Sequence, residues 1–274
     1  MVFAILSLHI IFPSLSLLHI MFSAIIPAFQ EEIRIKETLK ETCRIFDSLS
    51  NIESFEIIVV DDGSSDDTFE MAESFARDSD FEVLCFKLPE NCGKGNALRF
   101  GFWNCRGNLV TFLDADLDIH PLQLERLIRR MGDGVDVVVG SKRHPDSKIN
   151  YPWNRRFLSS MYSLFLVRPL FSLDLRDTQA GLKLFRRGVL EAVIPRISVR
   201  KFAFDLELLV NANDLGYKII EAPIDLEFGV SKMAFSNILD IFFDTLSIFY
   251  RRFSHQYNRR AELWGEMESV AWRD

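Results

Sequence analysis

The chain has 274 residues, enough for one large domain or two small ones with an apolar core of their own. Its 39 acidic and 32 basic residues give a formal net charge of -7, which argues against nucleic acid as a partner. Hydrophobic residues make up 48% of the chain, which excludes intrinsic disorder. The four cysteines include no C-x-x-C pair, so they predict neither a zinc site nor a disulfide framework and favour a reducing, cytosol-facing environment.

Residues 1–20 carry no charged side chain and are about as long as a membrane-spanning helix. A buried strand is predicted directly after them, so a span would enter the sheet without a linker. Two interpretations stay open: a start assigned too early, with Met21 as the true start, or a membrane anchor. We expect three regions, namely this apolar segment at 1–20, a main domain at 21–233, and an amphipathic helix with a basic tail at 234–274.

Short runs rich in β-branched and aromatic residues alternate with longer amphipathic stretches through the first half of the chain. The runs predict strands at 23–29, 55–60, 81–88, 108–117 and 135–142. The stretches between them predict helices at 32–49, 67–77, 95–105 and 121–131. This alternation is typical of an α/β domain with a mainly parallel sheet flanked by helices. The remainder reads as an insertion followed by a closing element.

Acidic residues follow two of the predicted strands, at the points where the strands end. Asp61 and Asp62 follow one strand, and Asp114, Asp116 and Asp118 follow another. In an open α/β sheet, ligands bind outside the carboxyl ends of the strands, so both groups are expected at one crevice. Their mutual repulsion would be relieved by a divalent cation with oxygen ligands. The spacing does not fit an EF-hand, because the sixth loop position, which needs glycine, is isoleucine.

A glycine-rich segment, Gly93-Lys94-Gly95, stands directly before a predicted helix. Such a loop can bring backbone N–H groups and an ammonium group to a phosphate. It is not a Walker P-loop, which has a different spacing, so nucleoside triphosphate hydrolysis loses its main support.

Taken together, these segments resemble the inverting family 2 glycosyltransferases. The resemblance rests on residues 27–31, 59–68, 93–97 and 114–116 in this order. Segments 176–185 and 202–209 are similar to those of the polyprenyl-phosphate sugar transferases, the dolichyl-phosphate glucose and mannose synthases. It covers about residues 23–233. It implies a GT-A fold, a nucleotide-sugar donor, Mg²⁺ or Mn²⁺ as cofactor, and a membrane-borne polyprenyl phosphate as acceptor.

The resemblance also implies roles for individual residues. The catalytic pair would be Asp114 and Asp116, and the metal ligands would be these two with Asp118. Nucleotide-sugar binding would fall to Pro27, Phe29, Glu31, Asp61, Asp62, Lys94, Gly95, Asp114 and Ala115, with the choice between Asp61 and Asp62 for the base or ribose left open. The acceptor phosphate would be held by Arg143, Arg155, Ser159, Gln179 and Lys232.

The implied reaction moves one hexose from UDP-glucose or GDP-mannose to dolichyl or another polyprenyl phosphate. Mannose synthases of this group tend to carry an arginine shortly before the Gly-x-Ser-Lys motif, and residues 226–228 contain none, which favours glucose. One alternative is a family 2 enzyme that builds a polysaccharide or glycolipid, although no Gln-x-x-Arg-Trp motif follows Asp205. Another is a non-catalytic nucleotide-binding scaffold.

Two phenylalanine-rich stretches, at 157–173 and 235–250, complete the pattern. In the second, Asp240, Asp244, Ser247 and Arg251 recur at helical spacing and predict a polar stripe opposite a wide apolar face. This pattern favours a helix at a membrane interface, with the arginine-rich tail near anionic head groups. We therefore expect a protein associated with the cytosolic face of a membrane. The competing interpretation is burial of these helices against the sheet or in a homo-oligomer.

Overall fold

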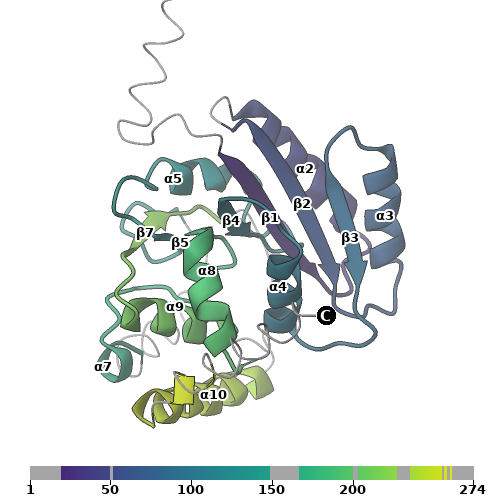
Figure 1. Cartoon of the computed structure of the whole chain (residues 1–274). Helices are drawn as coiled ribbons and strands as arrows, with labels where there is room; N and C mark the ends of the chain where they lie inside the picture. The colour runs from purple at the N-terminus through teal and green to yellow at the C-terminus, as the bar shows by residue number, and fades with distance from the viewer. Residues whose placement is uncertain are drawn as a thin grey trace, which may run out of the picture.

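The computed structural model describes residues 20–49, 52–148, 167–199, 203–226, 235–254, 256–257 and 260, with the side chains of the last helix described from residue 243 onward. At its centre lies a seven-stranded sheet with the order β3-β2-β1-β4-β6-β5-β7 (Figure 1). The strands are β1 (Met21–Ala28), β2 (Ser54–Asp61), β3 (Val83–Lys87), β4 (Leu109–Phe112), β5 (Val137–Ser141), β6 (Lys183–Arg186) and β7 (Ile219–Pro223). All pairings are parallel except those of β6 with β4 and β5. The predicted α/β class with a mainly parallel sheet is confirmed.

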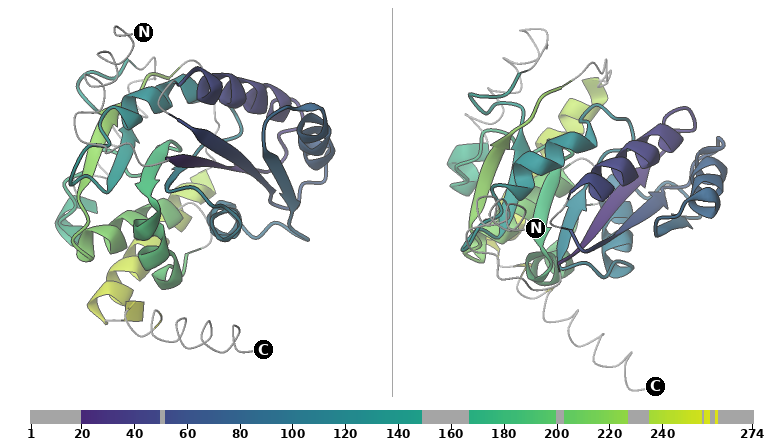
Figure 2. Two further views of the ribbon diagram at one scale, coloured as in Figure 1. Left: turned by 45° about the horizontal axis from the view of Figure 1, so that its top comes forward. Right: turned by 90° about the horizontal axis from the view of Figure 1, so that it is seen from above.

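Helices cover both faces of the sheet (Figure 2). One face carries α2 (Ile35–Ser48), α3 (Thr68–Asp78) and α5 (Leu124–Ile128), which follows the short helix η1 (Pro121–Gln123). The other carries α4 (Lys94–Trp103), α8 (Arg187–Val193), the short helix η3 (Ile194–Arg196), α9 (Phe204–Asp214) and α10 (Phe235–Phe253), with the short α7 (Arg168–Phe171) beside them. Successive residues of β1 point to opposite faces of the sheet: Ile25 packs in the core on the α4 side, and Ile26 packs in the core on the α2 side.

The predicted elements of the first half are present, with ends that differ by a few residues: β1 and β2 are longer than predicted, and most of the others are shorter. The largest difference is β4, which spans Leu109–Phe112 rather than 108–117. Leu113 still donates its N–H to the Ile25 carbonyl, but Leu117 has a left-handed backbone with φ of 58°, so the acidic residues lie in a loop. Strand β6 was not predicted, and its insertion between β4 and β5 is what breaks the parallel order.

Helix α10 lies against α9 and presents one face to solvent. Thr245 and Ile248 are fully buried, whereas the exposed fractions of Phe243, Tyr250 and Phe253 are 62%, 65% and 79%. The predicted polar stripe is wrong at Arg251, whose guanidinium faces inward to a buried glutamate. Within the described residues, no helix has the length and apolar character to cross a bilayer. Residues 1–19 and most of the predicted helix at 157–173 lie outside the described part.

Candidate active site

The loop after β4 is fixed to the amino-terminal end of α2. The Thr38 hydroxyl donates to the Ala115 carbonyl at 2.7 Å, and the Arg34 guanidinium donates to the Asp116 carbonyl at 2.8 Å. The Asp118 N–H donates to Asp116 Oδ1 at 3.0 Å. The acidic loop is therefore held mainly through its own backbone, and these contacts do not use Asp116 Oδ2. Thr38 and Arg34 carry no signal in the sequence that would assign them this role.

The segment 92–94 contacts acidic residues that follow two different strands. Both oxygens of Asp62 accept backbone N–H groups, from Cys92 and Gly93, at 2.9 Å each. The next residue, Lys94, begins α4, and its Nζ lies 2.5 Å from Asp114 Oδ1. Asp62 therefore fixes the backbone of the loop, and this places the Lys94 ammonium group against Asp114. The predicted convergence of these residues is present in the structure.

The carboxylates of the acidic loop differ in their electrostatic surroundings. Burial disfavours the charged form of Asp114, but the ammonium of Lys94, with a smaller contribution from Lys183, holds its pKa below the ordinary value. Burial and then the neighbouring Asp114 charge raise the pKa of Asp116. The ionised form of Asp116 is therefore disfavoured by its surroundings, and a cation bound beside it would favour that form.

The donor set of the loop fits a hard divalent cation. Carboxylate oxygens are the ligands that Mg²⁺ and Mn²⁺ prefer, and a cation would relieve the repulsion between Asp114 and Asp116. Asp118 lies 3.9 Å from Arg34, so part of its charge is already compensated. Among the described residues, no group of three or more His, Cys, Asp or Glu side chains has the arrangement of a complete metal site. Asp114 and Asp116 could supply two ligands, with a bound diphosphate supplying others.

Asp61 differs sharply from its neighbour Asp62. Its side chain is fully buried at the end of β2, and its Oδ1 accepts bonds from the N–H and hydroxyl of Ser64. Its Oδ2 has no hydrogen-bond partner among the described residues, and the nearest cation, Lys87 Nζ, is 3.8 Å away. A buried acceptor without a donor is costly unless a ligand supplies one. Of the two aspartates, Asp61 is therefore the one whose Oδ2 could accept a hydrogen bond from a ligand.

The other residues expected around the donor lie close to this edge of the sheet. Pro27 stands near the end of β1 beside Val60, and Phe29, just beyond, is 41% exposed. Burial and then the charge of Asp116 raise the pKa of Glu31. Gly95 allows close packing, since a Cβ there would lie 2.6 Å from the side chain of Phe204 on α9.

Two of the five residues expected to bind an acceptor phosphate are described. The Arg143 guanidinium donates to the Arg176 carbonyl, and burial lowers its pKa. Gln179 has a buried amide nitrogen, Nε2, with no hydrogen-bond partner in the described part of the chain. Arg155, Ser159 and Lys232 lie outside the described residues.

Sequence reasoning assigned no role to three residues that lie behind the acidic loop. Gly181 is so close that a Cβ there would lie within 1.7 Å of Asp114 Oδ2. Lys183 on β6 is fully buried and its Nζ lies 2.8 Å from Asp205 Oδ1 on α9. The residues stand in the segments 176–185 and 202–209 that carry the family resemblance, and Lys183 gives a further signal, because a lysine within the apolar run Leu182 to Phe185 needs a partner when buried.

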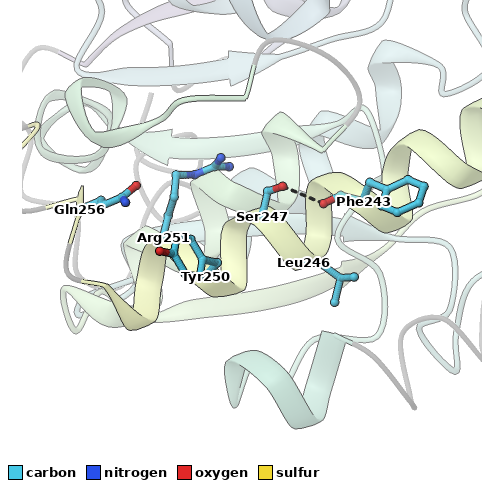
Figure 3. Close-up of a pocket in the computed structure, with 6 residues that line it drawn as sticks. All are labelled: Phe243, Leu246, Ser247, Tyr250, Arg251 and Gln256. Carbon is cyan, nitrogen blue, oxygen red and sulfur yellow. Dashed lines mark hydrogen bonds between the residues drawn. The ribbon is translucent and has the colours of Figure 1, made fainter.

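A hollow of about 420 Å³ lies along α10, and none of its lining residues belongs to the acidic loop (Figure 3). Its lining combines apolar and polar side chains, namely Phe243, Leu246, Ser247, Tyr250, Arg251 and Gln256. The Ser247 hydroxyl is turned back to the Phe243 carbonyl at 2.9 Å. It belongs to the exposed surface of α10 and adds no group to the acidic site.

The sequence and fold have close counterparts among known proteins. The chain is 31% identical over 238 residues to dolichyl-phosphate beta-glucosyltransferase ALG5A of Trichomonas vaginalis, covering 82% of this chain and 72% of that protein. It is 33% identical over 206 residues to glycosyltransferase AglD of Haloferax volcanii, covering 75% of this chain but only 33% of that longer protein.

Glucosyl-3-phosphoglycerate synthase of Mycobacterium tuberculosis, solved with Mn²⁺, UDP-glucose and phosphoglyceric acid, superposes with a TM-score of 0.65 at 20% identity. The match covers 85% of this chain and 79% of that one. At this identity the likeness shows the fold, which is the predicted GT-A fold. The model of the family described as glycosyl transferase family 2 matches residues 23–194. The chain belongs to glycosyl transferase family 2.

Proposed function

We propose that this protein transfers one hexose, with inversion, from a nucleotide diphospho-sugar to dolichyl or another polyprenyl phosphate, with metal assistance and with glucose favoured over mannose. The observation that carries the proposal is the meeting of Lys94, Asp114 and Asp116 at the carboxyl edge of the sheet. Departure of a nucleoside diphosphate requires stabilisation of the charge that develops on its oxygens. An ammonium group and a two-carboxylate metal site would provide it.

On the donor side, the buried Oδ2 of Asp61 would accept an N–H from the nucleotide base. Asp114 and Asp116 would hold Mg²⁺ or Mn²⁺, which supplies Lewis-acid stabilisation of the leaving diphosphate. Lys94 lies in contact with Asp114 and would share its charge with the same diphosphate. Phe29, Glu31 and Asp118 belong to this side by motif position.

On the acceptor side, Arg143 and the amide nitrogen of Gln179 would bind the polyprenyl phosphate. Guanidinium groups suit the multidentate geometry of phosphate. Arg155, Ser159 and Lys232 would complete this site by resemblance. A phosphate with a second pKa of about 6 is already anionic near neutral pH, so the attacking oxygen needs no strong general base.

The membrane side of the proposal rests on α10. Its outward face carries Phe243, Tyr250 and Phe253, which would enter the head-group region of the cytosolic leaflet. The relative ALG5A is named for a dolichyl phosphate acceptor, which is a membrane lipid. We assign residues 21–233 to the transferase domain and 234–274 to the membrane-interface region.

Transfer of labelled sugar to lipid tests the proposal directly. Purified protein would be incubated with a short polyprenyl phosphate, Mn²⁺ or Mg²⁺, and either UDP-glucose or GDP-mannose. We expect a metal-dependent, acid-labile labelled lipid with UDP-glucose. Binding of nucleotide and metal without lipid labelling would favour the enzyme that builds a polysaccharide or glycolipid. Binding without turnover of either sugar donor would favour the non-catalytic nucleotide-binding scaffold.

A further inference from the structure

Lys183 is a fully buried lysine in the middle of the sheet. It begins β6 and pairs in register with Phe112, two residues before Asp114. Its ammonium lies 2.8 Å from Asp205 Oδ1, and it also donates to the Ala180 carbonyl. Asp205 itself is only 6% exposed and stands in the first turn of α9. The pair therefore ties β6, α9 and the turn at residues 179–181 together.

That turn touches the proposed donor and acceptor sites at once. Gly181 lies directly against the Asp114 carboxylate, since a Cβ built on it would lie 2.3 Å from Asp114 Cγ. Gln179, two residues earlier, carries the buried amide nitrogen that has no hydrogen-bond partner in the described structure. Between them, the Ala180 carbonyl is the atom that Lys183 holds. Lys183 is therefore bonded to the residue that separates Gln179 from Gly181.

Stability alone gives a weak reason for this ion pair. Removing two charges from water costs several kcal/mol per ion, and replacing a buried pair with apolar residues of similar volume is often neutral or stabilising. A buried pair can also raise the affinity of a metal site, because groups that contact the metal's ligands orient those ligands. Lys183 lies behind Asp114 and is placed to act on Asp114 in this way.

We infer that Lys183 and Asp205 are positioning residues. Their ion pair fixes the turn at 179–181 and thereby holds Asp114 and Gln179 where the proposed donor and acceptor require them. Neither residue needs to touch the substrate. The inference rests on the proposed function, because it assigns Asp114 to a metal and diphosphate.

The experiment compares two buried ion pairs of the same helix. The test variant is Lys183→Met with Asp205→Leu, and the matched control is Arg251→Met with Glu207→Leu, which removes a pair on the α10 side of α9. The readout is the affinity of the purified chain for UDP by calorimetry, with and without Mn²⁺. The ratio of the two affinities reports the metal contribution, which a purely structural pair would not change.

We expect the test variant to lose about 10- to 100-fold of the Mn²⁺-dependent affinity while its affinity for UDP alone stays near that of the wild type. The control is expected to keep the wild-type ratio. If the test variant folds and keeps that ratio, the inference is wrong. If the wild type shows no Mn²⁺-dependent UDP binding, the proposed function fails instead, and the inference falls with it.

A second variant covers the case in which the double substitution does not fold. Asp205→Asn keeps the volume and an acceptor for Lys183 but removes the negative charge. We expect about tenfold weaker Mn²⁺-dependent UDP binding, with partial recovery in Asp205→Glu, which restores the charge. Wild-type affinity ratios in both variants would overturn the inference.

Discussion

The first turn of α9 carries two acidic residues, Asp205 and Glu207, that face different clusters. One cluster lies beside the candidate site, and the other is a structural contact. Asp205 faces Lys183 behind the acidic loop. Glu207, which is fully buried, accepts bonds from the N–H groups of Ser198 and Val199 at 2.8 and 2.7 Å, from Tyr257 at 2.8 Å and from Arg251 at 3.1 Å.

The two clusters differ in what lies beside their unsatisfied atoms. Both oxygens of Glu207 have donors, and this cluster fastens α10 to α9. Its buried Arg251 Nη2 makes no hydrogen bond in the described residues, but it lies 3.0 Å from Glu207 Oε1, so its charge has an opposite charge beside it. On the Asp205 side, Gln179 Nε2 is buried without a hydrogen-bond partner in the described residues, and burial and the Asp114 charge raise the pKa of Asp116. Buried charge is therefore common to both clusters, and a ligand is expected where no neighbouring group already satisfies the buried polar atom.

The largest expected effect is at Asp116 in the acidic loop. Asp116→Asn should lower the rate of sugar transfer about 10³-fold, because it removes a metal ligand next to the leaving diphosphate. The free energy of unfolding should hardly change, since within the described residues the Asp116 carboxylate makes no ion pair and the asparagine oxygen can still accept the Asp118 N–H. The turnover number and a urea titration would be measured on the same preparation.

Asp118→Asn is the matched control for this substitution, because it also removes one carboxylate from the loop. Asp118 lies beside Arg34, so we expect less than about a tenfold change in rate. Equal losses in the two variants would show that loop charge in general, and not the Asp116 ligand, sustains the reaction.

The Glu207 cluster should respond in the opposite sense, with stability changed and ligand binding kept. Glu207→Leu leaves the Arg251 guanidinium buried without its carboxylate, and should lower the free energy of unfolding by about 3–5 kcal/mol. The affinity of the folded protein for UDP should stay near that of the wild type. Chemical denaturation and calorimetry would separate the two quantities.

The control for this variant is Arg252→Met, which breaks a partly exposed pair with Asp214 on the same two helices. Such pairs contribute about 1 kcal/mol or less. A stability loss of similar size in both variants would contradict the view that Glu207 is the main fastening of α10.

A smaller effect is expected on the outer face of α10. Phe243→Asp with Phe253→Asp should weaken binding to anionic lipid vesicles about 10- to 100-fold, since each aromatic side chain would be only partly buried among the head groups and would contribute about 1 kcal/mol, less than the roughly 1.5–3 kcal/mol of full burial. Co-sedimentation with vesicles would measure it. Phe249 packs against Phe171 and the core, so substituting it would test stability rather than lipid contact. Undiminished vesicle binding of the double variant would remove α10 as the membrane contact.

The smallest expected effect concerns a surface pair. The Arg126 guanidinium bonds to Asp225 at 2.8 Å and holds the pKa of that carboxyl below its ordinary value of 3.8. A lowered pKa stabilises the folded state above the ordinary value, and this contribution disappears as the pH falls through the lowered pKa. Arg126→Met should therefore cost below about 1 kcal/mol near neutral pH and nothing at the lowest pH. An unfolding series in urea at several pH values would test the sign, and a difference that grows on acidification would contradict it.

The sequence predicts the first half of the fold better than the second for a physical reason. Strands such as β1 and β2 combine apolar runs with regular parallel crossovers, so periodicity identifies them. Strand β6 has only four residues and pairs antiparallel with strands far away in the chain, and no local pattern encodes that pairing.

The same limit applies to the site. Motif order brings Lys94 to Asp114 correctly, because both follow from strand ends that meet at one edge. The pattern could not separate Asp61 from Asp62, since the difference lies in which backbone N–H groups each accepts. Helical spacing predicts Arg251 on an exposed polar stripe, because the spacing contains no information about its partner Glu207 on another helix.

Formation of a lipid-linked sugar is the most direct test of metal-dependent hexose transfer to a polyprenyl phosphate. Wild type and Asp116→Asn would be compared with UDP-[¹⁴C]glucose, a short polyprenyl phosphate and Mn²⁺, each with and without a chelator. We expect one labelled lipid per UDP released, with the label lost on chelation and reduced about 10³-fold in the variant. Release of UDP without labelled lipid, or full activity in Asp116→Asn, would contradict it.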